Sequence, residues 1–346
     1  MKEDLRSLTY GELKATLLSY NQKGFRADQI FDWLHKKSVT DFTELRNIPK
    51  DLRQSLSEQY SIYPVKMQTV QISKKDGTRK YLFGLHDGNL IESVFMRYEH
   101  GNSVCVSSQV GCRMGCRFCA STTGGLLRNL TTGEILGQVY EIERDTGERV
   151  GNIVIMGTGE PLDNYDNVLA FIRLICDERG RGISERNITL STCGLTEGIR
   201  RLSRERLAIT LAISLHAPND TVRKQLMPVA NRYTIKEILS ACREYYEETG
   251  RRLTFEYSLA EGINDREEDA TELSSLLRGL NCHVNLIAVN PVTESGFAPP
   301  KRQTVLAFQN KLEKNHINVT IRRELGRDID GACGQLRRRV STGFLA

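Results

Sequence analysis

The chain has 346 residues, of which 39% are hydrophobic, and it carries a formal net charge of +5. No apolar run approaches the roughly 18–20 residues that cross a bilayer, and the first residues lack the apolar core of a signal peptide. We therefore expect a cytoplasmic protein without a membrane partner. Its length predicts one domain of roughly 200–250 residues with a small accessory domain, and the lack of a heptad pattern favours a monomer.

Residues 1–65 are predicted to form a small helical accessory domain. The apolar residues that should form one packed helix face are Phe25, Ile30, Phe31 and Leu34. Residues 66–100 then contain three strand-forming runs separated by Asp-Gly turns at 76–77 and 87–88. This stretch predicts a β-rich connector into the main domain.

Residues 101–337 alternate strand-forming runs with helical stretches. The runs cover residues 104–108, 152–157, 187–192, 208–215, 252–259, 283–289 and 317–322. Strands this apolar are typical of parallel sheets that are covered on both faces, and right-handed connections close such strands into a barrel or partial barrel. The sequence therefore predicts an α/β fold, a partial (β/α)6-type, TIM-like barrel of six to seven strands. Its chemistry should lie at the carboxyl ends of the strands.

Positive charge is concentrated at the end of the chain. Residues 301–346 hold ten Lys or Arg and four Asp or Glu, and residues 338–346 form a predicted basic tail. A basic segment favours a polyanion such as RNA as partner. The alternative, a solvated charged surface, is the more common meaning of such a run.

Three of the nine cysteines lie within eight residues, directly after the first strand of the main domain. Cys112, Cys116 and Cys119 have the spacing C-x3-C-x2-C. Three thiolates can hold three irons of a [4Fe–4S] cluster and leave the fourth iron open, where S-adenosylmethionine can be chelated through its amino and carboxylate groups. A zinc site would need a fourth ligand, usually from a second Cys or His pair. No such pair follows, so the pattern favours a cluster.

The cysteines outside this motif divide into two groups. Four are interpreted as small buried apolar residues: Cys176, Cys193, Cys242 and Cys282. Cys333 differs because it follows two acids in a Gly-rich loop, where a thiol can be approached. From the pattern alone, a functional and a structural role for Cys333 stay equally open.

Taken together, the motifs resemble the RlmN family, which are radical S-adenosylmethionine enzymes that methylate carbon 2 of adenosine in RNA. The matching segments, within residues 90–337, are CVSSQVGC, the cysteine motif with Phe118, GTGEPLDNYDNV, SLHAP, HVNLI and DIDGACGQL. Two departures are Thr158 in the glycine motif and Gly331, two residues before Cys333. Neither removes a functional position.

The resemblance implies a reaction that uses two S-adenosylmethionine molecules and two separate thiols. The first molecule methylates Cys333, and the second gives a radical that removes a hydrogen from that methyl group. The methylene radical adds to adenine, and Cys105 releases the product through a transient disulfide with Cys333. Glu92 matches the family's proton acceptor, with a surface glutamate as the alternative. The matching ligand-binding positions are Gly159, Glu160, Ser191, Ser214, Leu215, His216 and Asn290.

The family resemblance also implies the partners. The substrates would be an adenosine in the peptidyl-transferase centre of 23S rRNA and the adenosine 3′ to the tRNA anticodon. The electron donor would be a flavodoxin or ferredoxin, and the accessory domain and basic tail would contact RNA.

Two alternatives stay open at this stage. A sister family methylates carbon 8 of the same adenosine, but it tends to carry alanine where this chain has Pro161. A non-catalytic RNA-binding protein with a structural metal site would leave Cys105 and the GTGEP motif unexplained.

Overall fold

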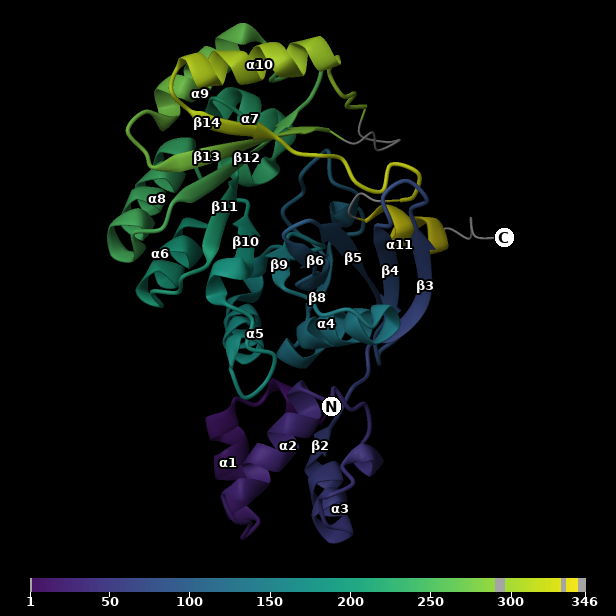
Figure 1. The fold of residues 1–346 in the computed structure, drawn as a ribbon. Coiled ribbons are helices and arrows are strands. Elements are labelled where there is room, and N and C mark those ends of the chain that lie inside the picture. The colour runs from purple at the N-terminus through teal and green to yellow at the C-terminus, as the bar shows by residue number, and fades with distance from the viewer. Residues whose placement is uncertain (1, 290–295, 331–333, 342–346) are drawn as a thin grey trace.

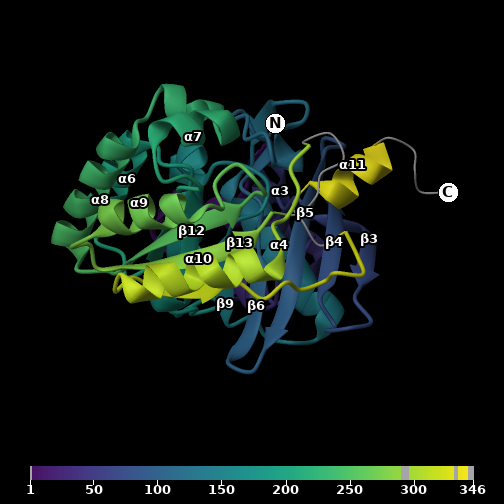
Figure 2. The ribbon, with the colours of Figure 1, turned by 90° about the horizontal axis from the view of Figure 1, so that it is seen from above.

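A ten-stranded sheet lies at the centre of the molecule (Figures 1 and 2). The computed structural model describes residues 2–289, 296–330 and 334–341. Among these residues, seven neighbouring strands run parallel, in the spatial order β14 (Asn318–Ile321), β13 (Cys282–Ala288), β12 (Leu253–Leu259), β11 (Thr210–Ser214), β10 (Ile188–Thr192), β9 (Asn152–Ile155) and β6 (Gly101–Cys105). The parallel strands confirm the predicted partial barrel.

Helices connect the parallel strands and cover the outer side of the sheet (Figure 1). They are α4 (Thr132–Thr146), α5 (Tyr165–Cys176), α6 (Thr196–Arg204), α8 (Ile235–Thr249), α9 (Glu267–Leu277) and α10 (Arg302–Lys314). The short helix α7 (Asp220–Leu226) lies between β11 and α8 in the chain and packs near the clustered cysteines. Both α4 and α8 begin with a capping box and end at a glycine in the left-handed conformation. These local signals fix where the chain leaves each helix for the next strand. Within the described residues, no helix combines the length and apolar character needed to span a membrane.

Three antiparallel strands extend the sheet beyond β6. β5 (Leu90–Tyr98) pairs with β6, and β4 (Arg79–Gly84) and β3 (Lys66–Ile72) follow outward. The two predicted Asp-Gly turns are present, with Gly77 at φ 72° and Gly88 at φ 83°, which glycine adopts without strain. The stretch predicted as a β-rich connector is therefore continuous with the barrel sheet.

Two short elements lie near the carboxyl end of β6. A hairpin of β7 (Gln109–Gly111) and β8 (Leu126–Asn129) flanks the loop that carries the clustered cysteines. The helix α11 (Gln335–Ser341) packs against β5, although it comes last in the chain (Figures 1 and 2). The antiparallel extension thus provides a surface on which the C-terminal segment docks.

The N-terminal helices form a small unit at one end of the sheet, at the bottom of Figure 1. They are α1 (Tyr10–Ser19), α2 (Phe25–His35) and α3 (Lys50–Gln59), with β1 (Glu3–Asp4) paired to β2 (Tyr60–Ser61). Ile30, Phe31 and Leu34 are buried as predicted, but Phe25 is 49% exposed. The prediction for Phe25 is wrong because it lies two and a half helical turns before Leu34, and so points about 180° away from it.

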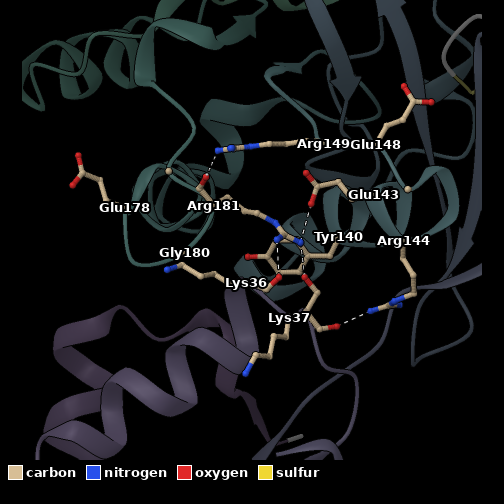
Figure 3. Close-up of a pocket in the computed structure, with 13 residues that line it drawn as sticks. Lys36, Lys37, Tyr140, Glu143, Arg144, Glu148, Arg149, Glu178, Gly180 and Arg181 are labelled. Atoms are coloured by element: carbon tan, nitrogen blue, oxygen red, sulfur yellow. Dashed lines mark hydrogen bonds and ion pairs between the residues drawn. The ribbon is translucent and has the colours of Figure 1, made fainter.

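A polar junction around Arg181 attaches this unit to the barrel (Figure 3). The Arg181 guanidinium pairs with Glu143 at 2.8 Å, and it donates to the Lys36 carbonyl at 2.8 Å and to the Ser38 hydroxyl at 2.7 Å. These bonds join the end of α2 to α4 and to the loop before β10. The cleft between them, of about 800 Å³, lies at the amino ends of the strands. Catalysis is expected at the opposite ends.

We expect Arg181→Ala to lower the free energy of unfolding by about 2–4 kcal/mol, because it removes one ion pair and two charge-assisted hydrogen bonds. Urea unfolding would measure this loss of stability. It can be followed by the fluorescence of Trp33, the only tryptophan of the chain, which lies on α2. Arg149→Ala is the matched control, since Arg149 lines the same cleft and donates to the Arg181 carbonyl at 3.0 Å. Equal losses for the two variants would contradict a central role for Arg181.

Candidate active site

A cavity of about 280 Å³ opens at the carboxyl ends of β9 to β13. The loop of clustered cysteines forms one wall, and the ends of the parallel strands form the rest. The predicted site residues that line it are Cys112, Cys116, Cys119, Gly159, Glu160, Ser191, Ser214 and His216. Leu215 is fully buried between two of these positions. The predicted residues Asn290 and Cys333 lie outside the described residues.

Backbone contacts hold the cysteine loop in place. Gly111 has φ 80°, and a Cβ there would lie 2.0 Å from the Gly125 carbonyl oxygen, so only glycine fits where the two ends of the loop meet. The Arg117 amide donates to the Leu226 carbonyl at 2.9 Å, which ties the loop to α7. The apolar residues packed around Cys112 are Met114, Phe118, Cys193, Leu226 and Met227. Cys193, predicted as a merely buried cysteine, is buried and also lines the cavity.

The three clustered thiols suit an iron–sulfur cluster. Burial raises the pKa of Cys112 to about 12 and raises the pKa of Cys116 further, so these thiols are neutral unless a metal charge favours the thiolates. All three thiols line one cavity. Three separate thiolates of this kind fit a [4Fe–4S] cluster, because each thiolate binds a different iron.

The turn after β9 packs tightly against the chain that follows β6. A Cβ on Gly157 would lie 2.7 Å from the Val106 carbonyl oxygen, and Gly159 adopts φ 116°. Both glycines of the GTGEP motif are therefore required by the backbone conformation or by close approach. Thr158 accepts backbone hydrogen bonds from Ser108 and Gln109, so the departure at Thr158 leaves the turn intact.

Glu160 connects the ends of two strands. Its carboxylate accepts hydrogen bonds from the Leu162 amide at 3.0 Å and from the Cys193 amide at 2.8 Å, and its own amide donates to Gln109 at 2.8 Å. Burial raises the pKa of Glu160, which these amide bonds partly oppose. The side chain thus faces the cavity from a position held by the backbone after β9 and β10.

Hydroxyl groups and a histidine occupy the next two strand ends. Ser191 and Ser214 lie on neighbouring strands with their hydroxyls 3.3 Å apart. His216 has a positive φ of 57°, and its Nδ1 accepts from the Ser258 amide at 2.9 Å. Burial lowers the pKa of His216 to about 3, so the ring is neutral near pH 7. The His216 and Phe118 rings pack in a T-shaped arrangement with their centroids 5.0 Å apart, so the His216 side chain connects β12 to the cysteine loop.

Sequence reasoning missed Arg223, a fully buried arginine on α7. Its guanidinium donates to the carbonyls of Cys193 at 2.6 Å, Leu215 at 3.2 Å and Tyr233 at 3.1 Å. It therefore holds the chain after β10 and after β11 from behind the cavity. No sequence pattern marks it, because an arginine on a short helix is normally a solvated residue.

Glu92 and Cys105 lie beside the cavity, on β5 and at the end of β6. Glu92 is 2% exposed, so its interpretation as a surface glutamate is wrong. Its carboxylate pairs with Lys80 at 2.7 Å, and Lys80 is itself 1% exposed. Cys105 is buried in an apolar group against which Met156 packs, and Met156 also lines the cavity.

The C-terminal segment reaches this region from the antiparallel strands. The amides of Gly334 and Arg337 both donate to Glu92 at 2.6 Å. Gly334 has φ 81°, and a Cβ there would lie 2.6 Å from the Ser121 amide nitrogen and 2.7 Å from the Ala120 carbonyl carbon. Before the Cys333 loop, Asp330 accepts a hydrogen bond from Gln71 of β3 at 2.9 Å. The described flanks therefore bring the segment against the cysteine loop.

The sequence matches two family models and several curated relatives. Residues 3–62 match the ribosomal RNA large subunit methyltransferase N-terminal domain, and residues 106–273 match the radical SAM superfamily. A probable dual-specificity RNA methyltransferase RlmN from Lachnoclostridium phytofermentans is 58% identical, over 97% of this chain and 95% of its own. The chain belongs to the RlmN family. A Clostridium novyi relative with the same name is 50% identical, over 97% of this chain and 98% of its own.

Structural comparison agrees with this assignment. The crystal structure of a radical SAM methyltransferase from Sphaerobacter thermophilus has a TM-score of 0.91 and 42% identity, covering 96% of this chain and 98% of that one. Membership of the RlmN family makes the chain a radical S-adenosylmethionine methyltransferase. Its cofactors are a [4Fe–4S] cluster, for which Cys112, Cys116 and Cys119 are the fitting ligands, and S-adenosylmethionine.

We expect Cys116→Ala to abolish cluster assembly, because two thiolates in this loop cannot replace three. Iron content and visible absorbance after anaerobic reconstitution would measure the loss. Cys242→Ala, at a buried cysteine of α8 outside the cavity, is the control and should retain both signals. Full iron loading of the Cys116 variant would show that the loop is not the cluster site.

We expect Lys80→Met to lower the free energy of unfolding by about 3–5 kcal/mol, since it removes one partner from a buried ion pair. It should also loosen the C-terminal segment that Glu92 holds, which limited proteolysis followed by mass spectrometry would detect. Lys66→Met, on the exposed start of β3, is the matched control. Unchanged cleavage near residues 326–341 would argue against this anchoring role.

Proposed function

We propose that this enzyme methylates carbon 2 of adenosine in RNA, with Cys333 as methyl carrier and Cys105 as the releasing thiol. The observation that carries the proposal is the position of Gly334, the neighbour of Cys333. Gly334 contacts Ala120 and Ser121, which directly follow the cluster cysteine Cys119, and it donates to Glu92. This contact favours a carrier thiol that works beside the radical source.

A carrier thiol is needed because of the chemistry of the acceptor. Carbon 2 of adenine is an aromatic C–H carbon without useful nucleophilicity, so direct displacement of a sulfonium methyl group does not reach it. Covalent catalysis divides such a difficult transfer into steps that are separately feasible. When bound, the cluster and two S-adenosylmethionine molecules supply a transferable methyl group and a 5′-deoxyadenosyl radical.

The protein's own groups carry the methyl group from one step to the next. The Cys333 thiolate forms a C–S bond to the methyl group as the sulfonium C–S bond breaks. The thioether then loses one hydrogen atom, and its methylene carbon bonds to adenine carbon 2. The adduct then gives up its carbon 2 proton to a base of the site, for which Glu92 is proposed below, and one electron, which the oxidised iron–sulfur cluster would accept. Finally, the Cys105 thiolate forms an S–S bond with Cys333, the S–CH2 bond breaks, and a proton completes the methyl product.

For Glu92 we propose a proton acceptor that is also an anchor. Both carboxylate oxygens already accept amide hydrogen bonds from the C-terminal segment, and Lys80 supplies a counter-charge. A base fixed in this way is held, before substrate arrives, next to Gly334, the chain neighbour of the carrier cysteine. Proton transfer requires a base at such short range.

As substrates we propose the adenosine in the peptidyl-transferase centre of 23S rRNA and the adenosine 3′ to the tRNA anticodon. The words "dual-specificity RNA methyltransferase" in the names of the relatives support two classes of RNA. Unstacked bases of this kind can be extruded into an active site. We further propose a monomeric, cytoplasmic enzyme with a flavodoxin or ferredoxin as electron donor, whose accessory domain, residues 1–65, and basic tail contact RNA.

The proposal predicts 2-methyladenosine as the product of anaerobic turnover with S-adenosylmethionine, a reductant and a ribosomal RNA fragment. Nucleoside digestion and mass spectrometry would identify it. Cys333→Ala should abolish the product completely, because no other thiol would carry the methyl group. Cys282→Ala, at a buried cysteine of β13, should retain activity.

Two outcomes would contradict the proposal. The production of 8-methyladenosine alone would place the chain with the sister chemistry. Full activity of the Cys333 variant would remove the methyl carrier from the mechanism. Cleavage of S-adenosylmethionine with an unmethylated ribosomal fragment, followed by methylation of tRNA, would restrict the substrate to tRNA.

A further inference from the structure

One carboxyl group in the cavity has no assigned role. Glu256 lies on β12, is 3% exposed and lines the same cavity as the clustered cysteines. Its Oε1 accepts a hydrogen bond from the Asn285 side chain at 2.9 Å. Its Oε2 is buried and has no hydrogen-bond partner within the described residues. A buried acceptor left unpaired costs about 1–3 kcal/mol, and more when it is charged, so this oxygen indicates a ligand.

Neighbouring side chains hold Glu256 in position. It belongs to a polar row that crosses the parallel strands, in which Ser191 lies beside Ser214 and Asn285 accepts from Thr320 at 2.9 Å. In the strand register, Glu256 is directly opposite Ser214 on one side and Asn285 on the other. Because Asn285 is itself held by Thr320, the direction of the free oxygen is fixed before any ligand binds.

The position of Glu256 in the sheet determines which part of a bound S-adenosylmethionine it can contact. Three strand spacings of about 4.8 Å separate β12 from β9, the strand that ends at the Glu160 turn. If the amino and carboxylate groups of S-adenosylmethionine bind an open iron close to that turn, as the family resemblance implies, they would lie too far along the sheet to reach Glu256. The nucleoside end of the molecule would then be the part that extends toward β12.

The nucleoside carries two kinds of hydrogen-bond donor: the ribose hydroxyls and the adenine amino group. Beyond Asn285, toward the open end of the barrel, the wall of β13 becomes apolar with Ile287, Ala288 and Val289. An apolar wall suits the faces of adenine, whereas the polar row below it suits the ribose. Arg322 also lines the cavity, and it opposes the rise in the pKa of Glu256 that burial causes.

We propose that Glu256 is a binding residue for S-adenosylmethionine, with its Oε2 accepting a hydrogen bond from a ribose hydroxyl group. Asn285, which donates to the other carboxylate oxygen, acts as its positioning residue. The proposal rests on the assignment of the cavity to S-adenosylmethionine and is independent of which RNA is methylated. It extends the predicted set of ligand-binding positions to a strand on which none was assigned.

The test is a comparison of binding affinities without RNA. Equilibrium binding of S-adenosylmethionine and of its 2′-deoxy and 3′-deoxy ribose analogues is measured on the reconstituted enzyme and on Glu256→Gln. This substitution keeps the shape but replaces the charged acceptor. We expect it to weaken S-adenosylmethionine binding about 10-fold to 100-fold, as the loss of a hydrogen bond to a charged group does. The analogue that lacks the hydroxyl group bound by Glu256 should bind the wild type weakly. Its affinity should fall no further in Glu256→Gln, because the hydrogen bond is already absent.

Controls separate this role from a structural one. Glu261→Gln makes the same change of charge at an exposed position of the loop after β12 and should bind like the wild type. Without ligand, Glu256→Gln should unfold at the same temperature as the wild type or higher, because it removes a buried, partly unpaired carboxyl group. Glu256→Asp, which withdraws the oxygen by one methylene group, gives a second variant that should show the same dependence on the analogue.

Two results would overturn the proposal. The first is wild-type affinity of Glu256→Gln for S-adenosylmethionine. The second is a loss of affinity in the variants that is equally large for S-adenosylmethionine and for both deoxy analogues. In that case the ribose hydroxyls would not be the groups that Glu256 binds. Product formation from RNA is not measured, so an error in the proposed substrate leaves both results interpretable.

Discussion

The structure around the site depends on one buried carboxylate. Glu92 accepts hydrogen bonds from amides that follow it by more than 240 residues, and Lys80 on the neighbouring strand supplies the opposite charge inside the protein. A buried ion pair is stable only when its other hydrogen-bonding positions are also satisfied. Here the two amides of the C-terminal segment donate to the carboxylate oxygens of Glu92. The antiparallel strands therefore have a function beyond connecting two domains, because they hold the end of the chain against the cysteine loop.

The barrel contributes a second kind of organisation. Parallel strands place all their carboxyl ends at one edge of the sheet, but they do not fix the loops that follow. Those loops are held by groups that bridge neighbouring strands: Glu160 joins the chain after β9 to that after β10, and Arg223 binds carbonyls after β10 and β11. His216 connects β11 to β12 and contacts the cysteine loop through Phe118. Precise placement of a ligand requires such bridges, because a loop held only at its ends leaves too much freedom.

Features with a strong local cause were predictable from the sequence. Apolar strand runs, Asp-Gly turns and the spacing of Cys112, Cys116 and Cys119 each follow from short-range patterns, and the structure places all of them as expected. Features that depend on long-range burial were not predictable. The sequence contains no sign that Lys80, Glu92 and Arg223 are removed from water, since these residue types are normally solvated. The error at Phe25 has the same origin, because only packing decides which of several apolar residues faces the core. The family resemblance supplied the residue roles that neither pattern nor packing reveals.

The acidic groups around the site differ in how far the protein itself satisfies their hydrogen bonds. Glu92 and Glu160 each accept a backbone amide on both carboxylate oxygens, so their side chains are held in place before any ligand binds. Glu256 is equally buried but has one oxygen without a partner among the described residues. A protein that leaves such an acceptor unpaired loses stability in the free state, and this loss is recovered only when a donor binds. The free energy of ligand binding is thereby coupled to the polar row across β10 to β14. In the proposed complex, a ribose hydroxyl group joins the same hydrogen-bond network that connects these strands.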